Sequence, residues 1–228
     1  LAHLPTPLEP MANLTRHVGG AQMLVKRDDC TGLAMGGNKI RQLEFYLGDA
    51  LSREADALLI TGAVQSNFVR SAIAGGNRLG MQSHVQLERR VERDGHLYAT
   101  SGNVLLDHLL GATIHHYPDG EDEAGADRQL ESIAPGLRND GHRPYVIHLA
   151  PGHAPLGALG YVVAAEELVQ QAQSKALVFD EVVVASGSGH THAGLLFGLR
   201  WLACPAVVTG VCVRRDATQQ RERILTRT

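Results

Sequence analysis

Short apolar runs alternate with longer stretches of helical periodicity along most of the chain, after an irregular entry marked by three prolines. This alternation is typical of βαβ units, in which each buried strand is followed by a helix. The pattern predicts strands at 22–26, 57–61, 83–87, 112–117, 144–148, 181–185 and 207–213.

The helical stretches carry apolar residues at three- and four-residue intervals. In the first of them, Ile40, Leu43, Leu47 and Leu51 form one apolar face. Further helices are predicted near 66–79, 102–110, 123–139, 156–172 and 191–202. The acidic residues of 120–127 place negative charge at the positive end of one of these helices. Together the elements predict an α/β protein with a mostly parallel sheet, helices on both faces, and ligand sites in strand-to-helix turns.

Composition narrows the class of partner. The 228 residues suffice for one large α/β domain or two smaller ones, and the formal net charge is -3. Arginines are mixed with acidic residues, so that no basic stripe for nucleic acid exists and a small-molecule partner is favoured.

The three cysteines show no CxxC or His-paired spacing, so neither a disulfide framework nor a metal site is expected. No apolar run approaches the roughly 20 residues of a membrane helix, and the first ten residues do not have the pattern of a signal peptide. We therefore expect a soluble, cytoplasmic protein without membrane contact.

The turn after the predicted strand at 181–185 is rich in small residues. The chain there reads VVVASGSGHTHAGLLFGL from 182 to 199. Glycines allow a ligand to approach the backbone, and the amides at the start of a helix attract an anion. The loop from Ser186 to Thr191 is therefore a candidate phosphate cradle, and its alternative is a tight turn between strand and helix.

A second turn follows the predicted strand at 57–61, where the chain reads LLITGAVQSNFVRSA from 58 to 72. Ser66 or Asn67 can cap the following helix. With Gln65, these residues also offer more hydrogen-bonding groups than one cap requires. Both interpretations, a helix cap and a ligand site, remain open at this point.

The third turn reads GLAMGGNKIRQLEF from 32 to 45 and contains Lys39. Of twenty-one lysines and arginines in the chain, only three are lysines. A lysine amine can act as a nucleophile once burial or a neighbouring cation lowers its pKa, whereas arginine cannot. Asn38 can supply amide hydrogen bonds or cap the helix, and the simple alternative for Lys39 is a solvated side chain. A reactive lysine together with a phosphate cradle is what pyridoxal phosphate requires, namely an amine for its aldehyde and a helix start for its phosphate.

The combined motifs resemble the pyridoxal-phosphate enzymes of the tryptophan-synthase-β fold type. Within this class the chain resembles the branch that contains D-cysteine desulfhydrase, L-cysteate sulfo-lyase and 1-aminocyclopropane-1-carboxylate deaminase. The motifs that carry the resemblance, in chain order, are PTPLEP, KRDDCTGLAMGGNKIRQLEF, TGAVQSNFVR, SGNVLLDHLLGA, RPYVI, PLGALGY and VVVASGSGHTHAGL.

The resemblance implies a fold and a division of the chain. It implies two three-layer αβα domains with mostly parallel sheets (fold type II). The large cofactor-binding domain comprises 1–42 and 148–228, and the small inserted domain comprises 43–147. Related proteins continue past the position of Thr228, so the C-terminal part of the large domain is expected to be absent from this chain. A homodimer is also expected.

The resemblance further implies the roles of site residues. Lys39 binds the cofactor covalently, and Asn67 bonds its phenolic oxygen, with Asn38 also at the cofactor. Ser66 and neighbouring amides bind the substrate carboxylate, and Ser66 assists proton transfer. The phosphate binds the backbone amides of four consecutive residues and one hydroxyl, that of Thr191; the four are Ser188, Gly189, His190 and Thr191.

Three departures from the D-cysteine enzymes bear on the substrate. Phe68 replaces a histidine after the QSN triplet, and His190 replaces a small residue, which the cradle tolerates unless the position needs a positive φ. A loop containing His148 and His153 replaces a shorter loop, and both histidines are either structural or face the site, where His153 can bind a sulfonate. The expected reaction is α,β-elimination from L-cysteate or D-cysteine, giving pyruvate, ammonia and sulfite or sulfide, and the histidine loop favours L-cysteate. The alternatives are a cyclopropane-opening deaminase and a non-catalytic pyridoxal-phosphate-binding paralogue.

Overall fold

The computed structural model describes residues 1–92, 95–150 and 152–228. Its strands are β1 (Leu8–Pro10), β2 (Leu24–Lys26), β3 (Ala57–Ala63), β4 (Gln82–Glu88), β5 (Thr113–Tyr117), β6 (Pro144–Ile147), β7 (Glu181–Ser186) and β8 (Val207–Cys212). Its α-helices are α1 (Ala12–Val18), α2 (Lys39–Ser52), α3 (Asn67–Arg78), α4 (His96–Thr100), α5 (Asn103–Leu109), α6 (Glu123–Asn139), α7 (Leu156–Ser174), α8 (His190–Trp201) and α9 (Ala217–Leu225). Two short 3₁₀ turns, Asp28–Thr31 and Leu33–Met35, precede α2.

The chain divides into two compact units. Unit 1 consists of Leu1–Gln42 and Pro155–Thr228, and unit 2 of Leu43–Ala154, so α2 begins in unit 1 and ends in unit 2. The return to unit 1 comes at Pro155, later than the expected residue 148. The reason is that His148 and Ala150 remain attached to α6 through two of its carboxylates, Glu131 at 2.8 Å and Asp127 at 3.2 Å.

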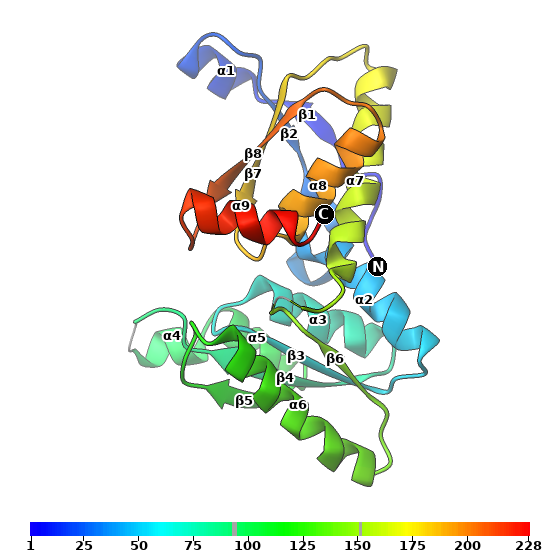
Figure 1. Ribbon diagram of the computed structural model, residues 1–228, viewed down its shortest axis with the longest axis vertical. Coiled ribbons are helices and arrows are strands. Elements are labelled where there is room, and N and C mark those ends of the chain that lie inside the picture. Colours follow the sequence, from blue (N-terminus) through cyan, green and yellow to red (C-terminus); the bar gives the residue numbers. More distant parts are fainter. Residues whose placement is uncertain (93–94, 151) are drawn as a thin grey trace. The chain divides into compact units, whose positions relative to one another are not determined.

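Unit 2 is built on a four-stranded sheet in the order β5-β4-β3-β6, with all neighbours parallel (Figure 1). Successive side chains of β3 point to opposite faces. On one face Leu59 packs with Leu130 and Ala134 of α6. On the other, Leu58 lies 3.6 Å from the position that a Cβ on Gly76 of α3 would occupy. Helices therefore cover both faces, and unit 2 has the expected three layers.

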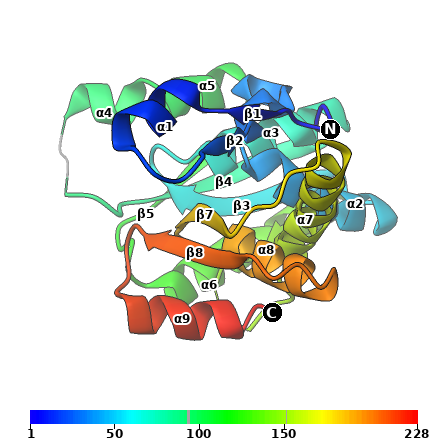
Figure 2. The ribbon, with the colours of Figure 1, turned by 90° about the horizontal axis from the view of Figure 1, so that it is seen from above.

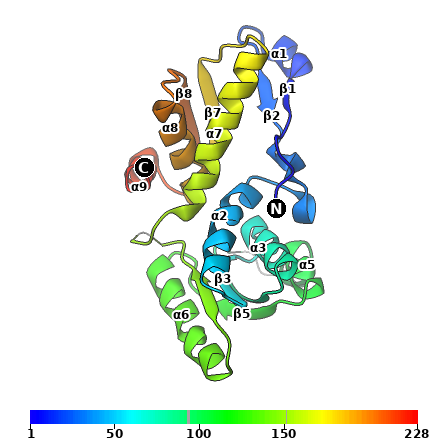
Figure 3. The ribbon, with the colours of Figure 1, turned by 90° about the vertical axis from the view of Figure 1, so that its right-hand side faces the viewer.

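Unit 1 contains a parallel pair of strands, β7 and β8, and an antiparallel pair, β1 and β2. Helices α7 and α8 pack together on one face of the β7–β8 pair (Figure 3). Tyr161 and Leu195 belong to the buried cluster of these helices, and Val182 and Val184 pack against this cluster. The two helices approach closely because α8 carries a glycine at the contact: a Cβ on Gly194 would lie 2.1 Å from a backbone oxygen of α7.

Each strand and helix expected from the apolar pattern is present, with ends that differ by at most two residues. The prediction of acidic residues at the start of α6 is also confirmed, since Asp122 caps the helix by accepting the amide hydrogen of Gly125 at 2.8 Å. Among the described strands and α-helices, four were not predicted, namely β1, α1, α4 and α9. Helices α1 and α4 bury no residue, so they leave no apolar periodicity to detect. None of the described helices is both long and apolar enough to span a membrane.

Candidate active site

Lys39 is the first residue of α2 and follows an unusual turn. Four consecutive residues before Asn38 have positive φ, namely 47° at Ala34, 68° at Met35, 68° at Gly36 and 107° at Gly37. Gly36 cannot be replaced without a shift of the backbone, because a Cβ there would lie 2.1 Å from the carbonyl oxygen of Asp29. Such backbone strain is characteristic of functional sites. This turn determines where α2 begins and therefore where Lys39 lies.

The amine of Lys39 is poised to lose its proton. Burial lowers the pKa of Lys39 to about 8, because the low-dielectric surroundings disfavour the charged ammonium. At neutral pH a useful fraction of this amine is therefore neutral and nucleophilic. A fully solvated lysine, the simple alternative, would not show this shift.

The β7–α8 turn has the geometry of an anion site. Gly189 has φ of 99° and lies at the N-cap of α8, where no side chain caps the helix. His190 is the first helical residue and is not among the positive-φ residues, so the conformational concern about a histidine at this position does not arise. The first amides of a helix have no intrahelical acceptor and attract anions.

Thr191 connects the β7–α8 turn to the start of α2, the two segments of unit 1 in which the sequence predicts site residues. Its hydroxyl oxygen accepts hydrogen bonds from Asn38 Nδ2 at 3.0 Å and from Gln42 Nε2 at 2.8 Å. With both acceptor positions occupied, the hydroxyl proton of Thr191 remains to be donated. Asn38 thus acts on the hydroxyl of Thr191, and the loop offers an oriented O–H donor at the start of α8.

Two arginines lie at this loop, Arg223 of α9 and Arg227 just beyond it, and α9 packs on α8 (Figure 2). Arg223 Nε donates to the Ser188 carbonyl oxygen at 2.9 Å, and an Arg227 guanidinium nitrogen lies 2.7 Å from His190 Nε2. Burial, together with the charges of Arg227 and Lys39, lowers the pKa of His190 to about 3. His190 is therefore neutral, and since arginine only donates, its Nε2 accepts. The surroundings of the turn favour a bound anion.

These groups of unit 1 fit a phosphorylated aldehyde such as pyridoxal phosphate. The open start of α8, the Thr191 hydroxyl and the neighbouring arginines suit a phosphate dianion. Lys39 supplies an amine of lowered pKa for the aldehyde. The chemistry of the donor set therefore agrees with the cofactor expected from the sequence.

In unit 2 the predicted residues lie at the start of α3. Ser66 caps the helix, because its Oγ accepts the amide hydrogen of Val69 at 3.2 Å. Asn67 Oδ1 accepts hydrogen bonds from Arg70 and from Asn103, each at 2.9 Å. The cap explains Ser66 locally, whereas the amide of Asn67 is held by residues outside any cap.

Phe68 and His153, both predicted near the substrate, make the following contacts within unit 2. Phe68 is 6% exposed and packs edge-to-face on Tyr46, with ring centroids 6.3 Å apart, so its side chain belongs to the core of unit 2. The ring of His153 stacks on that of His148 at 3.8 Å, and its Nε2 lies 4.0 Å from a carboxylate oxygen of Asp127. A carboxylate beside His153 disfavours a sulfonate at the same position.

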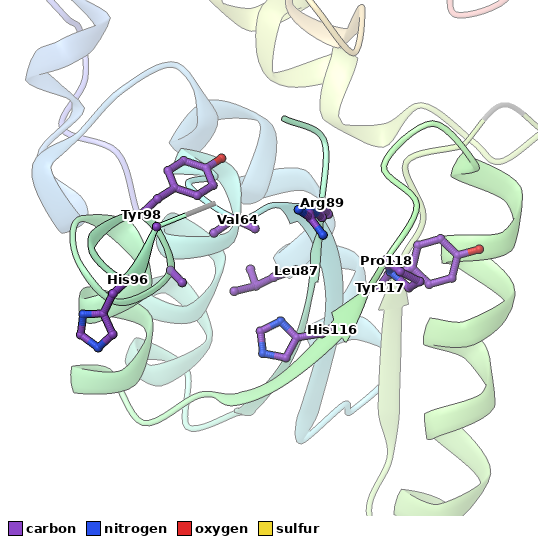
Figure 4. Close-up of a pocket in the computed structure, with 10 residues that line it drawn as sticks. Val64, Leu87, Arg89, His96, Tyr98, His116, Tyr117 and Pro118 are labelled. Carbon is purple, nitrogen blue, oxygen red and sulfur yellow. The ribbon is translucent and has the colours of Figure 1, made fainter. Parts of the chain in front are cut away.

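A cavity of about 420 Å³ lies in unit 2 at the carboxyl ends of β4 and β5 (Figure 4). Leu87 and Arg89 come from the end of β4, His116 from β5, and Tyr98 from α4. None of the predicted site residues lines it. The cavity is connected to the predicted residues Ser66 and Asn67 through their neighbour Gln65, whose side chain donates to the carbonyl oxygen of the cavity residue Tyr98 at 2.7 Å.

Several residues of these networks were not anticipated from the sequence, namely Gln42, Arg70, Asn103, Arg223 and Arg227. A signal existed for two of them. Arg70 follows Asn67 by three residues on α3, and this spacing places both side chains on one helix face. Asn103 lies inside SGNVLLDHLLGA, a motif already noted for its resemblance.

Comparison with known proteins agrees with this chemistry. The family model described as pyridoxal-phosphate dependent enzyme matches residues 1–224. The chain is 41% identical over 221 residues to a D-cysteine desulfhydrase of Salmonella paratyphi C and 42% identical to one of Klebsiella pneumoniae, covering 97% of this chain. It spans 66% of the length of each of these relatives.

Solved structures give the same result. A crystal structure of an ACC deaminase homologue superposes with a TM-score of 0.83 at 37% identity, over 99% of this chain and 67% of the other. Apo diaminopropionate ammonia lyase of Escherichia coli shares the fold, with a TM-score of 0.71 at 19% identity, over 98% of this chain and 62% of the other. The expected fold class and cofactor class are thereby confirmed. The chain belongs to the family of pyridoxal-phosphate dependent enzymes.

Proposed function

We propose that this chain is part of a pyridoxal-phosphate-dependent lyase that removes a β-sulfur substituent from a small amino acid, with D-cysteine as the first candidate substrate. The products would be pyruvate, ammonia and sulfide. The observation that carries the proposal is Lys39, half-buried after the strained turn that begins α2, with its pKa lowered to about 8. The 41% identity to a D-cysteine desulfhydrase supports the choice of substrate.

Lys39, Ser66, Asn67 and Thr191 each have a role in this proposal. Pyridoxal phosphate, when bound, withdraws electrons from the α-carbon of an amino acid. The start of α8 and the Thr191 hydroxyl would hold the phosphate, and Asn67 would donate to the phenolic oxygen. The Lys39 amine takes the α-proton, for which its lowered pKa suits it at neutral pH. Ser66 and its neighbouring amides bind the substrate carboxylate.

Two other substrates compete with D-cysteine. L-cysteate was favoured on the sequence because His153 could pair with its sulfonate, but the Asp127 carboxylate beside that ring weakens the argument. The cyclopropane amino acid remains a candidate because of the 37% identity to the ACC deaminase homologue. Neither has an observation in its favour equal to the similarity with the desulfhydrases.

Product analysis of the full-length protein separates these possibilities. The protein is incubated with D-cysteine, L-cysteate or 1-aminocyclopropane-1-carboxylate, and sulfide, sulfite, pyruvate and 2-oxobutyrate are measured. We expect sulfide and pyruvate from D-cysteine. Sulfite from L-cysteate alone, or 2-oxobutyrate alone, would replace the proposed substrate, and no product from any of the three would favour a non-catalytic binding protein.

The role of Lys39 is tested with a matched pair of lysine variants. We expect Lys39→Ala to lose the visible absorption of covalently bound cofactor and about 10²- to 10⁴-fold in product release, the usual range for a lost general base. Lys175→Ala is the control, because Lys175 lies in the same unit and donates to the Leu8 carbonyl oxygen at 2.8 Å. Unchanged absorption in Lys39→Ala would remove the covalent assignment.

A further inference from the structure

We infer that Arg70 and Asn103 are positioning residues that fix the orientation of the Asn67 amide, so that its Nδ2 is the group available to the phenolic oxygen of the cofactor. This inference rests on the proposed role of Asn67. Its evidence lies within unit 2, where α3 and α5 bring the three side chains together.

The argument begins with the guanidinium of Arg70. One of its terminal nitrogens lies 2.9 Å from a side-chain atom of Asn67 and 2.6 Å from one of Asn103. A guanidinium has donors and no acceptor. Both contacted atoms must therefore be amide oxygens, and Arg70 assigns the two amide orientations without reference to any other contact.

The side-chain amide of Asn103 gives further support to the orientation of the Asn67 amide. With its oxygen on Arg70, Asn103 turns its Nδ2 toward Asn67 Oδ1 and the Gln65 carbonyl oxygen, each at 2.9 Å. Gln65 Oε1 accepts the backbone amide of Asn103 at 2.8 Å, and its Nε2 donates to the carbonyl oxygens of Tyr98 and Ser101 at 2.7 and 3.0 Å. The NH₂ groups of Asn103 and Gln65 thus both meet acceptors, so neither of these two amides can turn alone.

Burial makes this arrangement difficult to reverse. Arg70 is 7% exposed and Asn103 is 9% exposed, so water cannot readily replace a lost partner. Turning the Asn67 amide would bring its NH₂ group against two donors, Arg70 and Asn103 Nδ2. The Asp107 carboxylate, on the same helix as Asn103, attracts Arg70 electrostatically and helps to keep it in place.

The consequence is a donor of defined direction. Asn67 Oδ1 is occupied by two donors, and Nδ2 donates to no residue in the described part of the chain, while the residue as a whole is exposed. A donor aimed at the phenolic oxygen favours its ionised form, whereas an amide oxygen there would favour the protonated form. The network therefore sets the charge state of the cofactor ring through Asn67.

The experiment compares two matched substitutions. Asn103→Asp replaces the donor opposite Asn67 Oδ1 with a carboxylate oxygen and engages the charge of Arg70, so that the Asn67 amide is driven to turn its NH₂ group inward and present its oxygen outward. We expect the holoenzyme to bind pyridoxal phosphate at least tenfold more weakly and its visible absorption to shift toward the form with a protonated phenolic oxygen. Asn77→Asp is the control, since Asn77 also joins α3 to α5, through a 2.7 Å bond to the Leu110 carbonyl oxygen, without contacting Asn67.

Substitutions of Arg70 provide a second, independent pair of variants. Lysine also only donates, so Arg70→Lys should retain the absorption spectrum at some cost in thermal stability, whereas Arg70→Gln should reproduce the shift seen for Asn103→Asp. A purely structural role would lower the melting temperature in both without separating their spectra. The two Arg70 variants therefore still test whether the network orients the Asn67 amide if Asn103→Asp does not fold.

Two results would overturn the inference: the parental spectrum and affinity in folded Asn103→Asp, or identical spectra for Arg70→Lys and Arg70→Gln. A failure of the proposed function would look different, because the parent itself would then bind no pyridoxal phosphate or release no product.

Discussion

Asp107 on α5 is a carboxylate in an unfavourable place. It is 0% exposed, and within the described residues neither of its side-chain oxygens has a hydrogen-bond partner. Burial raises the pKa of Asp107 to about 7, against the opposing attraction of Arg70. The folded protein therefore holds this proton far more tightly than the unfolded chain, in which the pKa is near its ordinary value of 3.8.

This difference predicts a pH dependence of stability with a definite sign. Because the folded-state pKa is raised, the contribution of Asp107 is intact below about pH 4 and declines as the pH rises toward 7. We expect the free energy of unfolding of Asp107→Asn, relative to the parent, to rise over this window by up to about 4 kcal/mol. Urea denaturation at several pH values measures it, and the exposed Asp140→Asn controls for the loss of one negative charge. A constant difference between pH 4 and 8 would contradict the prediction.

At the scale of residues, the sequence singles out a side chain only when its type is rare or its chemistry distinctive. Lys39 is conspicuous because it is one of three lysines. Arg70 is one of many arginines, and nothing local distinguishes a buried guanidinium from a solvated one. Its role depends on Asn103, thirty-three positions away, and such a long-range contact is set by packing.

Among the elements, α2 is tied to α7 by a buried ion pair. Arg41, 1% exposed, donates to both oxygens of Glu167 at 2.9 and 3.1 Å and to Asp28 at 3.1 Å. Glu167 also accepts from Lys26 and from the backbone amide of Thr6. The two helices meet closely here, because a Cβ on Gly160 of α7 would lie 2.1 Å from the Arg41 carbonyl oxygen. The network thus anchors the turn of α2 that carries Lys39.

Removing the negative charge of Glu167 should be strongly destabilising. Hydrogen bonds from Arg41 and Lys26 lower the pKa of Glu167 to about 2 despite its burial. We expect Glu167→Gln to cost about 3–5 kcal/mol in the free energy of unfolding at pH 7, because it removes one of the two carboxylates that pair with the buried Arg41 charge and also the partner of Lys26. Since the folded-state pKa is depressed, the parent loses this advantage as the pH falls through about 2, so the difference should shrink in acid. The adjacent, exposed Glu166→Gln should stay within about 0.5 kcal/mol of the parent, and equal losses in both variants would contradict the prediction.

Many of the elements that the sequence predicted have a buried apolar face. In α2 the Leu43 and Leu47 positions are fully buried, and their spacing is visible in the sequence. Helix α9 was missed because its polar residues dominate, although Asp216 and Gln219 form a capping box that marks its start. Strand β1 has only three residues and ends in a proline. Short or polar elements depend on tertiary contacts, which periodicity does not reveal.

At the scale of the whole molecule, the alternation of strands and helices predicted the layered architecture, but the resemblance was needed to predict that one unit is inserted into the other. Unit 2 conforms to the three-layer expectation. In unit 1, α7 and α8 cover one face of the β7–β8 pair. On the opposite face of the pair Val183, Val207 and Val211 are 63%, 56% and 54% exposed. The chain spans 66% of the length of its desulfhydrase relatives.

An apolar sheet face of this kind predicts the solution behaviour of the 228-residue chain. Val183 pairs with Thr209, and Ala185 with Val211, so these side chains share one face of the β7–β8 pair. Contiguous exposed apolar surface promotes association, and lysine on a strand opposes it. We expect the chain to self-associate with rising concentration and to bind an apolar dye, and expect Val183→Lys with Val211→Lys to reduce both by at least severalfold. Light scattering and dye fluorescence measure the effect, with Val163→Lys as the control because Val163 is 43% exposed on helix α7. A chain that stays monodisperse without binding the dye, or a double variant that associates like the parent, would show that this face does not drive association.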